Sequence, residues 1–353
     1  MIKRISIVLV LVAFIAGSYT GYAGGPYRMG TTTATFLELG VGGAGLAMGD
    51  ANVASTGDIS SIYWNPAGLA KMEKNQALFM YQPWVVDVNT IFAGFGLIFP
   101  QIGTIGVGMF AVDYGDIDVT TPDYQDGTGE KYTAYDMSIN LSYARNIVEW
   151  FAFGATGKYI HSKIWHSTAS AMVVDLGVIV QTKFFSPSGR QADGMKIGMS
   201  VSNYGGKMRY DGDDLLFPVD IDPAANGNYQ NLQGKYKMQD WEVPLLFRVG
   251  LSFNPIVLSN QRIQMEVDAL HPNNTSEYLN IGGQYIYNIP GFGEVYIRGG
   301  YKGLFLIDSQ YGFSAGGGIK MWVTPTYGMN IDYAFRTIGV LGDVHCTSLG
   351  FTF

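Results

Sequence analysis

Apolar and polar residues alternate along most of the chain from Asn75 onward. In the segment 132–144, apolar residues occupy every odd position from 135 to 143 and polar residues occupy the even positions between them. The segments 261–269 and 327–335 repeat this period of two. Such a period is typical of β-strands that present one apolar face and one polar face.

Glycine, proline, asparagine and aspartate divide this part of the chain into segments of about ten residues, which is the length of a tilted strand that crosses a membrane. We predict fourteen strands, and the number is even, as in bacterial single-chain barrels. The predicted strands are 75–87, 90–99, 103–113, 131–146, 150–162, 170–182, 194–204, 241–253, 260–270, 278–288, 293–302, 310–322, 327–335 and 344–353.

The connections between these strands should alternate between long outer loops and short periplasmic turns. The expected outer loops are 88–89, 114–130, 163–169, 205–240, 271–277, 303–309 and 336–343. The expected inner turns are 100–102, 147–149, 183–193, 254–259, 289–292 and 323–326. Of the inner turns, 183–193 is unusually long, and the sequence offers no reason for its length.

The composition distinguishes a membrane barrel from a soluble sandwich, whose strands also alternate. The chain has 47% hydrophobic residues, 47 glycines and only 14% charged residues, whereas soluble domains carry about 25% charged residues. After the N-terminus, no segment approaches the ~18 continuous apolar residues that a membrane helix needs. The fold class predicted is therefore all-β, a transmembrane antiparallel β-barrel. The net charge of −7 argues against nucleic acid as a partner.

The first residues are typical of a secretory signal. Lys3 and Arg4 precede the short apolar stretch 5–17, and small residues at 21–23 offer a cleavage site. We therefore expect a signal peptide at 1–23, an N-terminal hatch or plug at 24–74 and a single barrel domain at 75–353.

The hatch is predicted from a segment rich in glycine and alanine, 39–70, which can approach other backbone closely. The segment ends in Tyr63, Trp64, Asn65 and Pro66, followed by Gly68. Pro66 fixes its own φ angle, and the side chain of Asn65 can satisfy neighbouring backbone groups. We expect these residues to form a fixed stopper in the periplasmic mouth, with Trp64 packed on the strand wall.

Other motifs in the sequence do not predict a cofactor, metal or catalytic site. Residues 40–45 fit the GxGxxG pattern but lack the strand–helix context of a dinucleotide site. The single cysteine and the scattered histidines offer no metal-ligand spacing, and no catalytic triad motif is present. The acidic residues between 211 and 222 are read as a solvated loop, with calcium binding as the less favoured alternative. We expect no enzyme activity, no cofactor and no metal.

The charged residues on the polar faces of the predicted strands should line the barrel lumen. Both signs are present, which allows buried charges to be paired. They form either a salt-bridge network that binds the plug to the wall or a path with a direct role in substrate passage. These residues are Asp136, Lys158, Asp175, Arg248, Glu266, Asp268, Arg298, Asp332 and Arg336.

Three stretches resemble one protein family. They are the GGAGLAMGDANVAS…DISSIYWNPAGLA segment, the DALHPNNTSEYLNIGGQYIY segment and the C-terminal IDYAFRTIGVLGDVHCTSLGFTF. Together they resemble the PorV/PorQ family, which is similar to FadL-type outer-membrane barrels of fourteen strands. Leu349, Phe351 and Phe353 share one face and look like the signature that the barrel-assembly machinery reads. Cys346 departs from the family pattern, in which a basic residue is expected.

The resemblance implies a part in type IX protein secretion at the bacterial outer membrane. The partners that it implies are outer-membrane lipid, the barrel-assembly machinery, a type IX translocon and the C-terminal domains of exported proteins. The alternative is a FadL-like channel for uptake of hydrophobic small molecules. A shuttle needs binding surface on its outer loops, whereas a channel needs an apolar pocket inside the barrel with a lateral opening.

Overall fold

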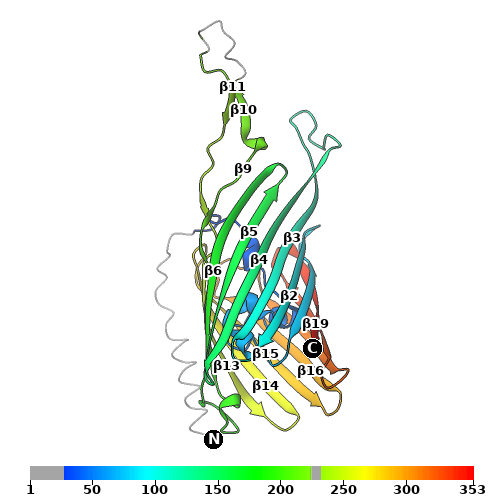
Figure 1. Cartoon of the computed structure of the whole chain (residues 1–353). Coiled ribbons are helices and arrows are strands. Elements are labelled where there is room, and N and C mark those ends of the chain that lie inside the picture. Colours follow the sequence, from blue (N-terminus) through cyan, green and yellow to red (C-terminus); the bar gives the residue numbers. More distant parts are fainter. Residues whose placement is uncertain (1–27, 223, 225–231) are drawn as a thin grey trace, which may run out of the picture.

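The computed structural model describes residues 28–222, 224 and 232–353, which form a tall β-barrel around a short helical segment (Figure 1). The expected signal peptide, 1–23, lies outside the described residues. The described part of the chain contains no helix that is long and apolar enough to cross a membrane, a finding that does not bear on crossing by β-strands.

Fourteen antiparallel strands close the barrel wall in the described residues. Each wall strand pairs with the wall strands that precede and follow it, and β1 pairs with β19, which joins Gln76 to Thr352 and closes the circle. The wall strands are β1 (Gln76–Pro83), β2 (Asn89–Phe99), β3 (Gly103–Asp118), β4 (Lys131–Val148), β5 (Phe151–Ile164), β6 (Ser167–Gln181), β7 (Lys196–Gly205), β13 (Leu246–Val257), β14 (Gln261–Pro272), β15 (Tyr278–Ile289), β16 (Gly293–Leu304), β17 (Phe313–Trp322), β18 (Gly328–Thr337) and β19 (Asp343–Thr352).

The two faces of the wall differ as the alternation predicts. On β4, Ile139 and Leu141 are exposed on the outer face, whereas Ser138 and Asn140 are buried on the inner face. A wall that is apolar outside and polar inside is the arrangement that lipid requires. The predicted fold class is confirmed.

Several strand boundaries at the outer rim differ from those predicted from the sequence. The connection expected at 163–169 is only the pair Trp165–His166, because β5 and β6 continue further than the pattern indicated. Trp165 adopts a φ of 52° there, in the left-handed region where residues other than glycine are uncommon. The eighth wall strand begins at Leu246 rather than at 241, because 241–242 pair outside the wall.

The long connection between β7 and β13 folds on itself outside the barrel. We call residues 206–245 the outer excursion. Its β10 (Leu216–Val219) and β11 (Leu232–Lys235) pair as a ribbon that projects beyond the rim (Figure 1). The remaining short elements of the excursion are β8 (Lys207–Met208), β9 (Asp211–Gly212), η4 (Asp213–Leu215) and β12 (Trp241–Glu242).

The long inner turn between β6 and β7 has a structural explanation. It contains the short helix η3 (Gln191–Asp193), and the carboxylate of Asp193 is buried. This carboxylate accepts a hydrogen bond from Nε of Arg190 at 2.9 Å, and Nη2 of Arg262 on β14 lies 3.4 Å away. The extra residues therefore fold back onto the lower ends of the neighbouring strands.

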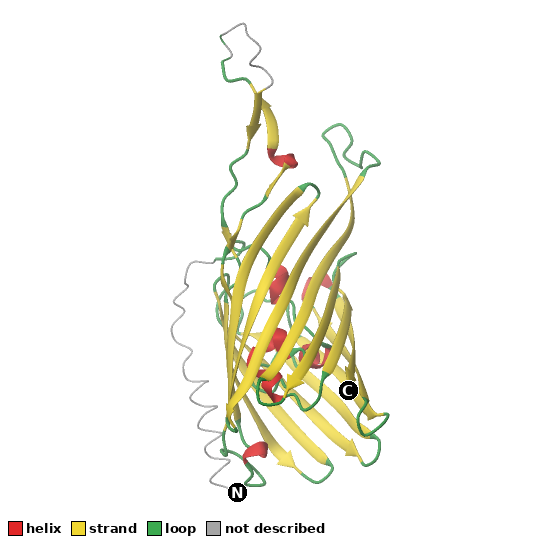
Figure 2. Cartoon of the chain, in the orientation of Figure 1, coloured by secondary structure: helices red, strands yellow, loops and turns green. Residues whose placement is uncertain are grey.

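Most of the N-terminal segment, which we define as residues 28–74, lies within the barrel (Figure 2), whereas Thr32 near its start bridges to Glu242 of the outer excursion. It contains η1 (Thr35–Glu38), α2 (Gly43–Ala47), α3 (Ser61–Trp64) and η2 (Pro66–Lys71). A further short helix, η5 (Gly339–Leu341), lies in the outer connection between β18 and β19.

Candidate functional site

Asn65 fastens the end of the N-terminal segment to the wall. Its Nδ2 donates to the carbonyl oxygens of Val53, at 2.9 Å, and Val178 on β6, at 3.1 Å. Its Oδ1 accepts from the amide of Ala67 at 3.1 Å and caps η2, which begins at Pro66. Asn65 is fully buried. The side chain therefore connects two parts of the segment to one strand, at the lower half of the barrel.

Trp64 packs against glycines of its own N-terminal segment, and its packing on the strand wall stays an expectation from the sequence. A Cβ atom added at Gly45 would lie 2.7 Å from the Trp64 ring, and one added at Gly40 would lie 3.1 Å from it. The indole Nε1 donates to the carbonyl oxygen of Val41 at 2.9 Å. Two of the three glycines of the GxGxxG pattern, Gly40 and Gly45, thus allow close packing around an indole ring.

Tyr63 and Gly68, two further residues of the predicted stopper, also lie in this packed region. Tyr63 is buried and meets the ring of Trp64 edge-on, with ring centroids 4.8 Å apart. A Cβ atom added at Gly68 would lie 2.5 Å from the hydroxyl oxygen of Ser61. The space at Gly68 therefore admits hydrogen but no larger side chain.

Two carboxylates on β14 hold the backbone of residues 52–55. Oδ2 of Asp268 accepts from the amides of Asn52 and Val53, at 2.9 and 3.1 Å. Oε1 of Glu266 accepts from the amides of Ala54 and Ser55, at 2.7 and 3.3 Å. Both carboxylates are completely buried. The two side chains together accept four hydrogen bonds from backbone amides, so this is a principal attachment of the segment to the wall.

Asp50 forms a second attachment, with two cations of the wall. Nζ of Lys302 on β16 lies 2.7 Å from its carboxylate, and Nη2 of Arg336 on β18 donates to the other carboxylate oxygen. Nη2 of Arg336 also donates to the carbonyl oxygen of Leu46 at 3.2 Å. Burial alone would raise the pKa of Asp50, but the two cations outweigh burial and hold this pKa below its ordinary value.

Sequence reasoning missed Lys302 and Asp50. Lys302 follows Arg298 by four positions on the same strand, so strand parity already places the two side chains on one face. Asp50 lies within the glycine-rich segment, where the sequence gives no sign that it meets a cation.

The remaining charged residues of the predicted lumen set pair within the wall. Nη1 of Arg298 lies 2.5 Å from Asp332, and Nζ of Lys158 lies 2.6 Å from Asp175. Nη1 of Arg248 donates to Oγ of Ser202 at 2.8 Å, and its guanidinium lies over the ring of Tyr63. All of these charged groups are buried.

Asp136 is the member of the predicted lumen set that is only half-buried. Its carboxylate accepts a hydrogen bond from the hydroxyl of Tyr114 at 2.5 Å. Tyr114 belongs to the neighbouring strand β3, so this contact also lies within the wall.

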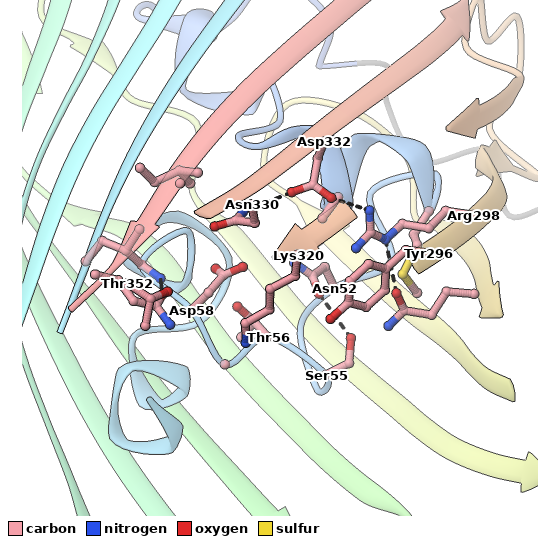
Figure 3. A pocket seen from close by; sticks show the side chains of 18 of the residues that line it. Asn52, Ser55, Thr56, Asp58, Tyr296, Arg298, Lys320, Asn330, Asp332 and Thr352 are labelled. Carbon is pink, nitrogen blue, oxygen red and sulfur yellow. Dashed lines mark hydrogen bonds and ion pairs between the residues drawn. The ribbon is translucent and has the colours of Figure 1, made fainter. Parts of the chain in front are cut away.

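A polar cavity of about 250 Å³ remains between residues 52–59 and the wall (Figure 3). Arg298, Lys320 and Asp58 contribute charged groups to its lining, together with Tyr296 and Asn330. Asp58 accepts hydrogen bonds from the amide and hydroxyl of Ser60, and burial raises the pKa of its carboxyl. The cavity is small and polar, and an apolar ligand would find few partners in it.

Apolar side chains fill the barrel above the attachments. Phe36 stacks on Phe110 of β3 with ring centroids 5.8 Å apart, and Tyr63 meets the same ring edge-on at 6.3 Å. Leu37 and Val41 belong to the same buried cluster. The N-terminal segment thus occupies the region beneath the outer loops.

The histidines and the acidic loop residues lie apart from the interior. Nδ1 of His166, at the β5–β6 turn, lies 2.9 Å from Asp214 of the outer excursion. His271 pairs with Glu277, and His345 pairs with Tyr333 on the outer wall. Across residues 28–222, 224 and 232–353, no group of three or more His, Cys, Asp or Glu side chains is placed to hold a metal ion.

The last strand presents Leu349 and Phe351 outward, while Cys346 points inward and is buried. Phe353 stacks on Phe95 of β2 with ring centroids 5.7 Å apart. The thiol of Cys346 belongs to the apolar interior cluster. The three residues of the predicted assembly signal therefore lie where the wall faces lipid.

The sequence matches the family of the type IX secretion system protein PorV over residues 25–222, which is more than half of the 353-residue chain. The chain belongs to the PorV family. A comparison with curated protein sequences found no match.

Solved structures similar to this PorV-family protein are FadL-like barrels. The CymD monoaromatic hydrocarbon channel matches with a TM-score of 0.54 and 16% identity, over 89% of this chain and 98% of that chain. The Pseudomonas putida toluene transporter TodX matches with a TM-score of 0.53 and 11% identity, over 88% of this chain and 97% of that chain. A Pseudomonas aeruginosa FadL homologue matches with a TM-score of 0.52 and 10% identity, over 89% of this chain and 98% of that chain. At these identities the likeness establishes the fold.

Family and fold together place the PorV-family protein in the bacterial outer membrane, as predicted. They also agree with the resemblance to PorV that the sequence motifs carry. The family match associates the chain with type IX secretion.

Proposed function

We propose that this PorV-family protein is a non-enzymatic binding or shuttle component of type IX secretion that engages exported proteins at the outer membrane. The family match supports the secretion role. The proposed partners are a type IX translocon and the C-terminal domains of exported proteins, in addition to the barrel-assembly machinery, which would read Leu349, Phe351 and Phe353.

The observation that carries the proposal is the filled interior of the barrel. The N-terminal segment is attached to β14 through Glu266 and Asp268, and to β16 and β18 through Asp50. Buried polar groups with these partners are costly to separate. We therefore infer that the segment is a permanent plug and that cargo binds to the outer surface.

Uptake of hydrophobic small molecules is less favoured. Two of the similar structures are titled as a hydrocarbon channel and a toluene transporter, and they share the fold of this chain. In this chain, however, Phe36 and Tyr63 fill the apolar region beneath the outer loops against Phe110. An apolar ligand would first have to displace these rings.

Cross-linking of the tagged protein in intact outer membranes, followed by mass spectrometry, tests the proposal. We expect a large translocon barrel and exported C-terminal domains among the cross-linked partners. An unrelated tagged outer-membrane barrel serves as the control. Recovery of neither partner above that control would contradict the secretion role.

A further inference from the structure

An aromatic groove lies on the outer rim, at a distance from the plug attachments. We call it the outer groove, and its volume is about 500 Å³. It is enclosed by the upper ends of β3 and β4, the β5–β6 turn and the outer excursion. Its apolar lining consists of Val119, Tyr132, Ile164, Trp165, Tyr210, Leu215 and Met238.

Two stacked rings, Tyr132 and Trp165, line one side of the outer groove, and the ring of His166 stacks on Trp165 next to it. Tyr132 stacks on Trp165 with ring centroids 5.4 Å apart, and Trp165 stacks on His166 at 4.8 Å. The amide of Trp165 donates to the carbonyl oxygen of Thr133 at 3.2 Å, which ties the tight turn to β4. A stack of this kind presents large, rigid contact area at low entropic cost.

Asp214 holds the opposite side of the groove in place. Its carboxylate accepts from the amide and Nδ1 of His166, at 3.0 and 2.9 Å, and from the hydroxyl of Ser167 at 3.2 Å. The hydrogen bond from His166 is the main reason why the pKa of Asp214 lies below its ordinary value. The outer excursion is therefore docked onto the β5–β6 turn, and the groove between them is defined by specific contacts.

The rim of the groove is acidic. Residues 113–131 carry six acidic residues and one basic residue. Asp118 lines the groove and is exposed. Among the residues that the structure describes, none forms a hydrogen bond or ion pair with the carboxylates of Asp116, Asp118 or Glu130. The basic residues of the nearby excursion do not offset this charge, because the excursion carries seven acidic residues and four basic ones. Three of the four, Lys207, Arg209 and Lys235, pair with acids of the excursion itself.

We propose that the outer groove binds an extended, cationic segment of an exported protein, in which lysine or arginine side chains neighbour apolar or aromatic ones. A cation would lie near the exposed carboxylate of Asp118, while its apolar neighbours pack against the edge of the ring stack and fill the lining. Tyr132 and His166 stack on Trp165, so the rings supply rigid apolar contact area, and complementary charge accelerates encounter. This inference rests on the proposed secretion function and names the surface and the chemistry of its cargo.

The test uses the purified full-length protein in lipid nanodiscs and a short fluorescent peptide that alternates lysine with valine and tyrosine. A peptide with glutamate in place of lysine is the matched probe. We expect the lysine peptide to bind at least about tenfold more tightly than the glutamate peptide, with an affinity that falls as salt rises.

Two variants locate the binding. Trp165→Asn removes the ring while asparagine tolerates the positive φ, and Asp118→Lys reverses an exposed charge. Each should weaken binding of the lysine peptide by about threefold to tenfold. Asp343→Lys, an exposed change on β19, five strands from β5 along the wall, should leave it unchanged.

Equal binding of the two peptides, or unchanged binding in both groove variants, would overturn the inference. So would maltohexaose binding that depends on Trp165 while the lysine peptide fails to bind, because the groove would then be a glycan site. If cross-linking in outer membranes still captures exported C-terminal domains, the proposed function stands and only the groove assignment is wrong. If no exported domain is captured, the proposed function is wrong, and so is the assignment of an exported protein as the ligand of the groove.

Discussion

The ammonium nitrogen of Lys302 lies 2.7 Å from the carboxylate of Asp50, which joins β16 to the N-terminal segment. Asp50→Asn would leave Lys302 and Arg336 buried without their anion. We expect this change to lower the free energy of unfolding by ~3–5 kcal/mol, because removing one partner of a buried ion pair leaves the other charge buried and uncompensated. Asparagine tolerates the φ of 63° at this position, so the change isolates the charge from the backbone.

Denaturant unfolding of the refolded barrel in lipid vesicles measures this effect. Asp87→Asn, an exposed change in the outer connection between β1 and β2, is the control and should lie within about 0.5 kcal/mol of the native protein. Equal stability of the Asp50 and Asp87 variants would show that the pair contributes nothing to holding the segment.

The outer face of β4 provides a test of how deep its residues lie in the membrane. Leu141 is 62% exposed to the surroundings of the barrel, so Leu141→Arg places a charge in hydrocarbon. We expect a loss of ~2–4 kcal/mol for arginine near the midplane. Ile147→Arg, an exposed change near the end of the same strand, should cost only ~0–1 kcal/mol. Denaturant titrations measure the free energy of unfolding of the two variants. Similar losses at both positions would contradict the placement of Leu141 deeper in the membrane than Ile147.

Asn65 tests the attachment of the segment at the lower half of the barrel. Asn65→Ala removes three hydrogen bonds and leaves buried backbone groups without partners, at a cost of ~1–3 kcal/mol. Asn146→Ala removes one exposed hydrogen bond, to the carbonyl oxygen of Ala70, and is the control. Amide hydrogen exchange should accelerate in residues 60–70 for the first variant only. Unchanged exchange in both variants would mean that contacts other than those of Asn65 are sufficient to hold residues 60–70 in place.

Strand periodicity made most of the wall predictable from the sequence. The period of two identified every wall strand to within a few residues and assigned Glu266, Asp268 and Arg336 to the inner face, because a strand alternates its side chains strictly. The unusually tight turn at Trp165 was missed, because tryptophan is a poor indicator of a positive φ.

The sequence did not predict contacts between residues that are far apart along the chain. Nothing near Asp50 indicates Lys302, which follows it by 252 positions, and nothing near Asp193 indicates Arg262. Nothing in the sequence indicated that the ring of Trp64 would pack against Gly40 and Gly45 of its own segment.

The central claim is that the N-terminal segment closes the barrel and that cargo is engaged outside it. Conductance of the purified protein in planar lipid bilayers, compared with a variant that lacks residues 40–70, tests this claim most directly. We expect the native protein to conduct no ions and the deletion variant, whose wall strands remain paired from Gln76 onward, to insert and conduct. A deletion variant that inserts and stays closed, or a native protein that already conducts, would contradict the account.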